Sequence, residues 1–495
     1  MRGITTQLGA TALERVGPFF EDDERGGAKR LDEVMEGHVR GLLDKKDLGR
    51  FGQTSRRNRT MTEQESYGSP TLEELRQAHI RTTRLERTKT QNRFNTRLAE
   101  LIANVNLRYF PTKIEIEEFD QLVLPESFGL LRSLKSLVLE EFDQLVLPES
   151  FGLLRSLEVL VLYDCALTTL PKTFGQLTSL KSLKLGVNNL TTLPSSFDNI
   201  RSLEVLILDH NQLTTLPNSI GTLRSLKVLK VSSNLLTELQ ESFGPLRSLE
   251  ELDLADNQLT TLPDSFGRLS SLKHLYLDNN QLTTLPEFFG QLTSLERLSL
   301  NHNDLTTLPN SFGQLISLNW LNLKGNSLTA LPDSFGRLRS LEYLNIGDSA
   351  LLEIPNVLRQ FRSLEFLVLS DNLLTALPDW LGELRTLKRL FLDGNNLTVL
   401  PDSFGNLFLL DYLVLKENKL TILPDSFGNL RTLVYLDLND NYLTTLPNSF
   451  GELVWLKYLD LNDNLFATVD WNNTGFRDDN QEIRKWLSEN IPQHR

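Results

Sequence analysis

Residues 249–271 read LEELDLADNQLTTLPDSFGRLSS, and most of the chain consists of copies of this unit. Its proline, Pro263, recurs at a constant interval of 23 residues from Pro125 to Pro447, and Gln240 is the one substitution in that column. Units of constant length that repeat without insertions are typical of solenoids, in which each unit contacts its neighbours in sequence. The sequence therefore predicts one solenoid, although a length of 495 residues would otherwise indicate several domains.

The first half of each unit predicts a short β-strand. Leu252 and Leu254 alternate with Asp253, so the leucines share one face of the strand and the aspartate lies on the other. No single unit can bury its leucine face, so neighbouring strands must form one parallel sheet. From Ile114 to Leu461 there are 16 strand positions. We expect an α/β solenoid with a concave parallel sheet of these strands, short helical or irregular convex segments, and a helical cap at each end.

The second half of each unit predicts the turn and the core packing. Asn257 stands where the chain leaves the strand, and its carboxamide can satisfy backbone groups of the turn, so we expect a buried asparagine ladder. Phe266 recurs at the same interval and predicts an aromatic spine in the core. Gly267 follows, at a position that needs either a positive φ or a close approach of two backbones. Four residues interrupt the asparagine column: Phe119, Phe142, Cys165 and Ser349. We expect the first turns, where phenylalanine replaces asparagine, to deviate locally.

Charge is unevenly distributed along the chain. Residues 1–112 hold 20 Lys and Arg against 16 Asp and Glu, whereas residues 113–495 hold 31 against 48, a net charge of −17. Such an acidic solenoid is not expected to bind nucleic acid, which requires a basic surface. The single cysteine, Cys165, rules out an intrachain disulfide and favours a reducing compartment, so we expect a cytoplasmic protein. Neither a signal peptide nor a run of about 18 apolar residues is found, so no membrane span is predicted.

The repeats define the predicted domain boundaries. Four segments follow from them: a polar, partly disordered extension (1–70), a basic helix with the N-terminal cap (71–112), the repeats (113–470) and a C-terminal capping helix (471–495). Between Arg76 and Arg97, seven basic residues stand against one acidic residue. This basic arm is either a solvated helix or a segment that docks on an acidic surface.

The exposed strand positions of the late repeats predict a binding surface. The residue just before the first leucine of each strand is small or aliphatic in the early repeats but aromatic or basic in the late ones: Trp320, Tyr343, Phe366, Arg389, Tyr412, Tyr435 and Tyr458. Phe391 lies one strand position away, and acidic residues flank this column: Asp371, Asp393, Glu417, Asp437, Asp440 and Asp460. Aromatic and arginine side chains on an exposed face are typical of interface hot spots. Alternatively, adjacent rings stack on one another and merely cover the sheet.

The charges around this surface predict the chemistry of its partner. An aromatic surface flanked by carboxylates should prefer a basic protein. That partner is either a separate protein with a basic patch or the chain's own basic arm. A second exposed column alternates between lysine and glutamate, as at Lys227 and Glu250, and predicts ion pairs that support the register of the sheet.

Motifs for catalysis and for cofactors are missing from the sequence. There is no phosphate-binding P-loop, no G-x-S-x-G nucleophile motif and no kinase signature. His210 and His302 would lie about 20 Å apart in the sheet, too far to share a metal ion. We therefore expect a protein that is not an enzyme and that binds neither a metal nor a cofactor.

The unit LxxLxLxxNxLTxLPxSFGxLxS resembles the 23-residue leucine-rich repeats of intracellular Ras-suppressor-like and plant intracellular Ras-group proteins. This resemblance covers residues 113–470. It implies a horseshoe-shaped, cytoplasmic interaction scaffold, often in signalling through small GTPases or phosphatases. Similar arrays adjoin the GTPase module of Roco proteins, but the missing P-loop argues against such a GTPase here. Two alternatives are a structural subunit of a larger assembly and a recognition protein of a defence or receptor pathway.

Overall fold

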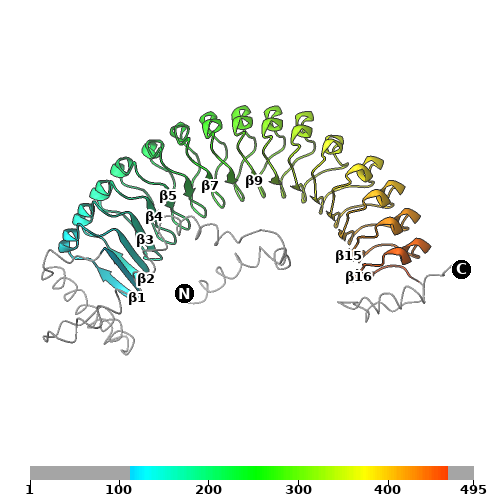
Figure 1. Ribbon diagram of the computed structural model, residues 1–495, viewed down its shortest axis with the longest axis horizontal. Helices are drawn as coiled ribbons and strands as arrows, with labels where there is room; N and C mark the ends of the chain where they lie inside the picture. The colour runs from blue at the N-terminus through cyan, green and yellow to red at the C-terminus, as the bar shows by residue number, and fades with distance from the viewer. Residues whose placement is uncertain (1–111, 467–495) are drawn as a thin grey trace, which may run out of the picture. The chain divides into compact units, whose positions relative to one another are not determined.

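The computed structural model describes residues 112–466, with residues 116–121 described for the backbone only. Three predicted features therefore lie outside the described residues: the polar extension, the basic arm with the N-terminal cap, and the C-terminal capping helix. The described residues form a solenoid whose strands line the inner, concave side of an arc and whose short helical turns line the outer, convex side (Figure 1). The predicted fold is confirmed for this part of the chain.

The concave side is one parallel sheet of 16 strands in sequence order. Each strand pairs with the next at the repeat interval, as where Leu252 of β7 lies opposite Leu275 of β8. The strands are β1 (Lys113–Val123), β2 (Ser136–Val146), β3 (Val159–Tyr163), β4 (Ser182–Lys184), β5 (Val205–Ile207), β6 (Val228–Lys230), β7 (Glu251–Asp253), β8 (His274–Tyr276), β9 (Arg297–Ser299), β10 (Trp320–Asn322), β11 (Tyr343–Asn345), β12 (Phe366–Val368), β13 (Arg389–Phe391), β14 (Tyr412–Val414), β15 (Tyr435–Asp437) and β16 (Tyr458–Asp460).

The convex side consists of short 3₁₀ helices, each preceded by the column proline or, once, by Gln240. Proline fixes φ before the turn and has no N–H group to leave unpaired. In η7, the Phe266 N–H donates to the Pro263 carbonyl at 3.0 Å. The helices are η1 (Glu126–Leu130), η2 (Glu149–Leu153), η3 (Lys172–Gln176), η4 (Ser195–Asn199), η5 (Asn218–Thr222), η6 (Glu241–Phe243), η7 (Asp264–Arg268), η8 (Glu287–Gln291), η9 (Asn310–Gln314), η10 (Asp333–Arg337), η11 (Asn356–Gln360), η12 (Asp379–Glu383), η13 (Asp402–Asn406), η14 (Asp425–Asn429) and η15 (Asn448–Glu452).

The core between the two sides is filled by leucine and by the predicted phenylalanine spine. Phe128 and Phe151 stack with ring centroids 6.2 Å apart and nearly parallel planes, and this spacing recurs along the array. Both rings are fully buried. In the repeat where Leu358 replaces the phenylalanine, Phe361 packs against Phe335 instead, at 5.8 Å and tilted by 49°. The spine removes a large apolar area from water and links each repeat to the next.

The predicted asparagine ladder closes each turn. The Asn257 amide nitrogen donates to the carbonyl of Val231 in the preceding repeat at 2.9 Å, and to two carbonyls of its own repeat. Its side-chain oxygen accepts the Leu236 N–H at 3.0 Å. Because one buried carboxamide satisfies several backbone groups of two repeats, the chain can turn inward without leaving them unpaired.

The exceptions in the asparagine column change the structure as expected. With phenylalanine at positions 119 and 142, strands β1 and β2 continue past the ladder position and each run for 11 residues. At Cys165 the turn is kept: its Sγ lies 3.2 Å from the carbonyl oxygens of Leu139 and Tyr163. Burial raises the pKa of the Cys165 thiol to about 12, so this cysteine is structural rather than reactive.

The glycine after the spine residue is required for close approach. A Cβ built on Gly428 would lie 2.6 Å from the Ser449 Cβ and overlap the Ser449 carbonyl oxygen in the next repeat. Positive φ occurs at a different position, the residue before each ladder asparagine, as at Asp256 (54°). The β-branched Val187 also adopts it, at 53°, which is unfavourable for such a side chain.

We predict that Gly428→Ala lowers the free energy of unfolding by about 1–3 kcal/mol, because the added methyl group overpacks the contact between repeats. The matched control is Gly451→Ala in the last described helix, where an added Cβ meets no atom of residues 112–466 within 4 Å. Thermal denaturation of the two variants measures the difference. Equal losses in both would show that the requirement lies in the helical turn itself and not in the neighbouring repeat.

Candidate functional site

The concave face is built from the residues that flank the central leucine of each strand. In β14, Leu413 is buried while Tyr412 points to the opposite face, because successive side chains alternate across a strand. The first residues of β10 to β16 make one column across the sheet, which we call the aromatic column: Trp320, Tyr343, Phe366, Arg389, Tyr412, Tyr435 and Tyr458.

The rings of the aromatic column contact one another at its two ends. Trp320 and Tyr343 stack with centroids 4.9 Å apart, and the Phe366 ring lies 6.0 Å from that of Tyr343 with its plane tilted by 38°. At the other end Tyr412, Tyr435 and Tyr458 lie nearly parallel, with successive centroids 4.0 Å and 4.1 Å apart. Burial raises the pKa of the middle phenol, Tyr435, and the neighbouring Tyr412 raises it further.

Arg389 joins the two halves of the column. Its guanidinium carbon lies 4.8 Å from the Phe366 ring centroid and 6.0 Å from that of Tyr412, a geometry that permits cation–π attraction on both sides. Phe391 is the third residue of β13, and its ring centroid lies 5.3 Å from that of Tyr412, so it widens the apolar surface. The rings do stack on one another, as the second interpretation of the sequence predicted, yet every member of the column stays partly exposed.

Two predicted carboxylates, Asp437 and Asp460, lie side by side next to the tyrosines. They are register partners at the ends of β15 and β16. Each accepts a backbone N–H two residues on, from Asn439 at 3.0 Å and from Asn462 at 2.9 Å. Burial raises the pKa of Asp437 to about 6; the Asn439 N–H opposes this rise and the charge of Asp460 adds to it. Such a like-charged pair favours the approach of a cation.

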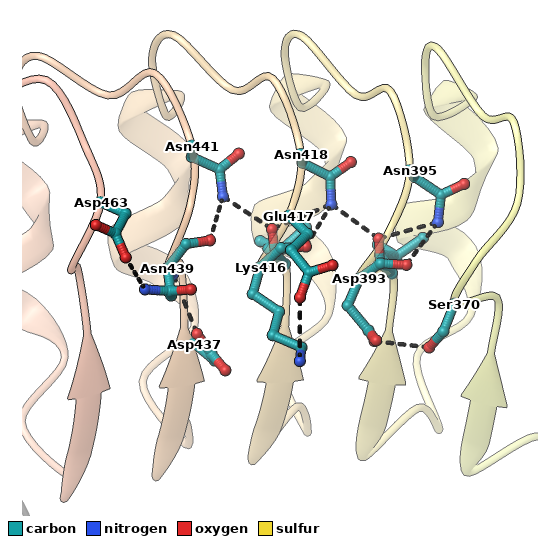
Figure 2. Close-up of polar contacts among 12 residues, drawn as sticks. Ser370, Asp393, Asn395, Lys416, Glu417, Asn418, Asp437, Asn439, Asn441 and Asp463 are labelled. Atoms are coloured by element: carbon teal, nitrogen blue, oxygen red, sulfur yellow. Dashed lines mark hydrogen bonds and ion pairs between the residues drawn. The ribbon is translucent and has the colours of Figure 1, made fainter.

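The other predicted carboxylates lie in the turns that follow the strands, as Figure 2 shows for Asp393 and Glu417. Asp393 accepts a hydrogen bond of 2.6 Å from the Ser370 hydroxyl group, and the Glu417 carboxylate lies 3.4 Å from the Lys416 ammonium group. Asp371, Glu417 and Asp440 occupy the positive-φ position before the ladder asparagine, so they also serve the turn. The structure thus places aromatic and acidic residues in adjacent rows of one face.

Several comparisons with known proteins bear on this fold. Leucine rich repeat family profiles match residues 155–213, 201–259, 224–282, 385–441 and 421–466, and two-copy and single-copy profiles of the repeat match residues 270–311 and 317–338. A leucine-rich repeat protein of Leptospira interrogans has a similar structure with a TM-score of 0.70 and 35% identity, covering 80% of this chain and 97% of that one. This chain is a leucine-rich repeat protein.

Other solved structures share the fold of this leucine-rich repeat protein at lower identity. Drosophila Toll, in its complex with Spatzle, has a TM-score of 0.64 and 24% identity, and the match covers 75% of this chain and 53% of that chain. The Arabidopsis receptor kinase HAESA, in complex with the peptide hormone IDA and a co-receptor, has a TM-score of 0.51 and 28% identity. The match covers 71% of this chain and 70% of that chain. A comparison with curated proteins finds no match.

Sequence reasoning missed a second polar cluster on the concave face, between β5 and β9. Lys230 and Glu251 form an ion pair of 2.8 Å with only 12% and 16% of their side chains exposed. Burial alone would lower the pKa of Lys230, but the adjacent Glu251 outweighs it and the pKa is raised. Burial also raises the pKa of Asp253 to about 7 and that of Asp278 to about 6. The available signal was Lys230 followed one repeat later by Asp253 at the third strand position, with Glu251 in the same strand.

Two structural features are absent from the part of the chain that the structure describes. Among residues 112–466, no three His, Cys, Asp or Glu side chains lie close enough together to hold a metal ion. The same residues contain no helix that is long and apolar enough to span a bilayer.

The pKa of Asp253 predicts a dependence of stability on pH. The folded-state pKa is about 7, above the ordinary value near 4. The contribution of this carboxyl group to the free energy of unfolding is therefore highest below pH 4, where the group is neutral, and it is lost as the pH rises to 7 and the group ionises. Asp253→Asn keeps an acceptor for the Ala255 N–H and cannot ionise, so it should stabilise the protein at pH 8 by about 1–2 kcal/mol.

Thermal denaturation at pH 4 and pH 8 tests this expectation. The gain from Asp253→Asn should vanish at the lower pH, while Asp264→Asn, an exposed change in the same repeat, should show no such pattern. A gain of the same size at both pH values would contradict the assignment.

Proposed function

We propose that this leucine-rich repeat protein is a non-catalytic scaffold that binds protein partners through the concave face from Trp320 to Tyr458. The aromatic column, whose two ring clusters are joined by Arg389, is the observation that carries the proposal. Large, partly exposed rings already ordered by stacking offer contact area with little further loss of side-chain entropy on binding. Leucine-rich repeat arrays are in general protein-interaction modules, and the fold itself supplies no chemistry.

The proposed partner presents basic side chains to this face. Asp437 and Asp460 lie side by side at its acidic end, and a partner's lysine or arginine would relieve their repulsion. The partly exposed rings of Tyr412 and Tyr435 beside them offer apolar contact to the aliphatic stem of that side chain. The candidates are the chain's own basic arm between Arg76 and Arg97, or a separate protein with a basic patch, such as a small GTPase.

Three observations support further parts of the proposal. The HAESA structure, solved with a peptide hormone bound, shows a related array in a complex with peptide and protein. The single cysteine is buried and free, which suits a reducing compartment, so we place the protein in the cytoplasm. The 23-residue unit favours the Ras-suppressor-like class and a role in signalling. Fractionation of cells that express the full chain tests the location.

We predict that Tyr412→Ala combined with Tyr435→Ala weakens partner binding at least tenfold, because truncated hot-spot rings typically cost about 2 kcal/mol or more. Partners captured by the full chain are identified first, and the affinity of each is then measured for both proteins. The matched control is Val205→Ala with Val228→Ala, which changes the same column in β5 and β6. Unchanged affinity in the tyrosine variant, with folding intact, would refute the proposal.

Binding of a basic partner should also depend on pH. Because the pKa of Asp437 is about 6, its carboxylate is charged at pH 7.5 and largely neutral at pH 5. We expect affinity to fall as the pH drops through 6, and Asp437→Asn should remove most of that dependence. A partner whose affinity rises on acidification would have the wrong charge for this face.

A further inference from the structure

The repeat between Leu341 and Ser363 departs from the regular pattern on its convex side. Arg359 replaces the glycine that follows the spine residue, and Phe361 replaces the leucine that ends the helical turn. That last residue has ψ of 137°, whereas Leu338 and Leu384, its counterparts in the neighbouring repeats, have ψ of 65° and 64°. The chain therefore leaves η11 in another direction.

This departure changes the hydrogen bonds of the turn. In the repeats on either side, the N–H groups of Arg339 and Arg385 donate to carbonyls two residues back, at 2.8 Å and 2.9 Å. The equivalent bond from the Arg362 N–H is not formed among residues 112–466. Instead, the Arg362 guanidinium donates to the carbonyls of Arg359 and Phe361, at 2.9 Å and 3.2 Å.

A hollow opens beside this turn, with a volume of about 400 Å³. Its lining consists of the buried ring of Phe361 and of polar side chains from two neighbouring repeats: Arg362, Glu383, Arg385 and Thr386. Glu383 ends η12, and the other lining residues lie between η11 and β12 or between η12 and β13, so none of them is part of the aromatic column on the concave face.

The hollow has an excess of positive charge. Arg359 and Glu383 form a two-pronged ion pair, with bonds of 3.0 Å and 2.8 Å. Within the described residues, Arg362 and Arg385 have no carboxylate within 4.0 Å, although the solenoid as a whole is acidic. The lining thus carries two guanidinium groups and one carboxylate, and Arg359 already neutralises that carboxylate.

We propose that this hollow binds a phosphate monoester. Guanidinium groups match the oxygen atoms of phosphate with paired, charge-assisted hydrogen bonds, and a dianion would neutralise both Arg362 and Arg385. The volume exceeds that of one phosphate group, which leaves room for the carrier of the ester. The carrier is either a phosphorylated segment of a partner protein or a small phosphorylated compound, and the chemistry recognised is the same.

The test measures binding of the full chain to a fluorescent peptide that contains one phosphoserine. The same peptide with unmodified serine is the reference, and inorganic phosphate is the competitor. We expect the phosphopeptide to bind at least tenfold more tightly than its reference and to be displaced by phosphate. If free phosphoserine competes as strongly as the phosphopeptide, the natural carrier is a small compound.

Variants separate this site from general charge attraction. Arg362→Ala with Arg385→Ala should weaken phosphopeptide binding about tenfold. The matched control, Arg224→Ala with Arg247→Ala, removes two arginines from the same column where the regular turn bonds are kept, at 2.9 Å and 2.8 Å, and should change binding less than about twofold. Glu383→Gln removes the one acidic residue among the described lining of the hollow and should strengthen binding.

Two results would overturn the proposal. Equal losses in the two arginine variants would mean that any pair of edge arginines attracts the peptide. Equal affinity for the phosphorylated and unmodified peptides would mean that phosphate is not recognised. Thermal denaturation of each variant shows that an observed loss does not come from misfolding.

Discussion

The carboxamide of the ladder asparagine holds one repeat to the next and thereby sets the geometry of the whole array. In Asn441 the amide nitrogen donates to the Leu415 carbonyl of the preceding repeat at 2.9 Å, while the oxygen accepts the Leu420 N–H at 3.0 Å. Both bonds exist only if successive turns superimpose at the repeat interval. A buried carboxamide without them would be costly, so this contact supports the register of the strands in the repeats that carry the asparagine.

A constant register converts sequence columns into surface stripes. Lysine and glutamate in one exposed column become ion pairs, as between Lys273 and Glu250 at 2.8 Å, and being exposed they contribute little energy. The aromatic column becomes a stack of rings, and the adjacent positions bring Asp437 beside Asp460. The same scaffold thus carries a neutral supporting stripe and a surface with the composition of an interface.

Departures from the repeat have local effects that the neighbouring repeats absorb. Phenylalanine in place of asparagine at position 142 lengthens β2 to 11 residues but leaves its pairing with β3 intact. Arg359 and Phe361 alter one turn and open a hollow, while Phe361 still packs against the spine at Phe335. Because each repeat contacts mainly its two neighbours, such changes can create a new surface without unfolding the array.

The sequence alone determined the solenoid, its strands, the buried ladder and spine, and the membership of the aromatic column. These follow from a fixed period and from the alternation of side chains along a strand, which are local properties. The tertiary structure alone decided that Gly428 serves close approach, that Asp253 and Asp437 have raised pKa values, and that Arg362 and Arg385 line one hollow. Those features depend on distances and burial between different repeats, which no single repeat's residues specify.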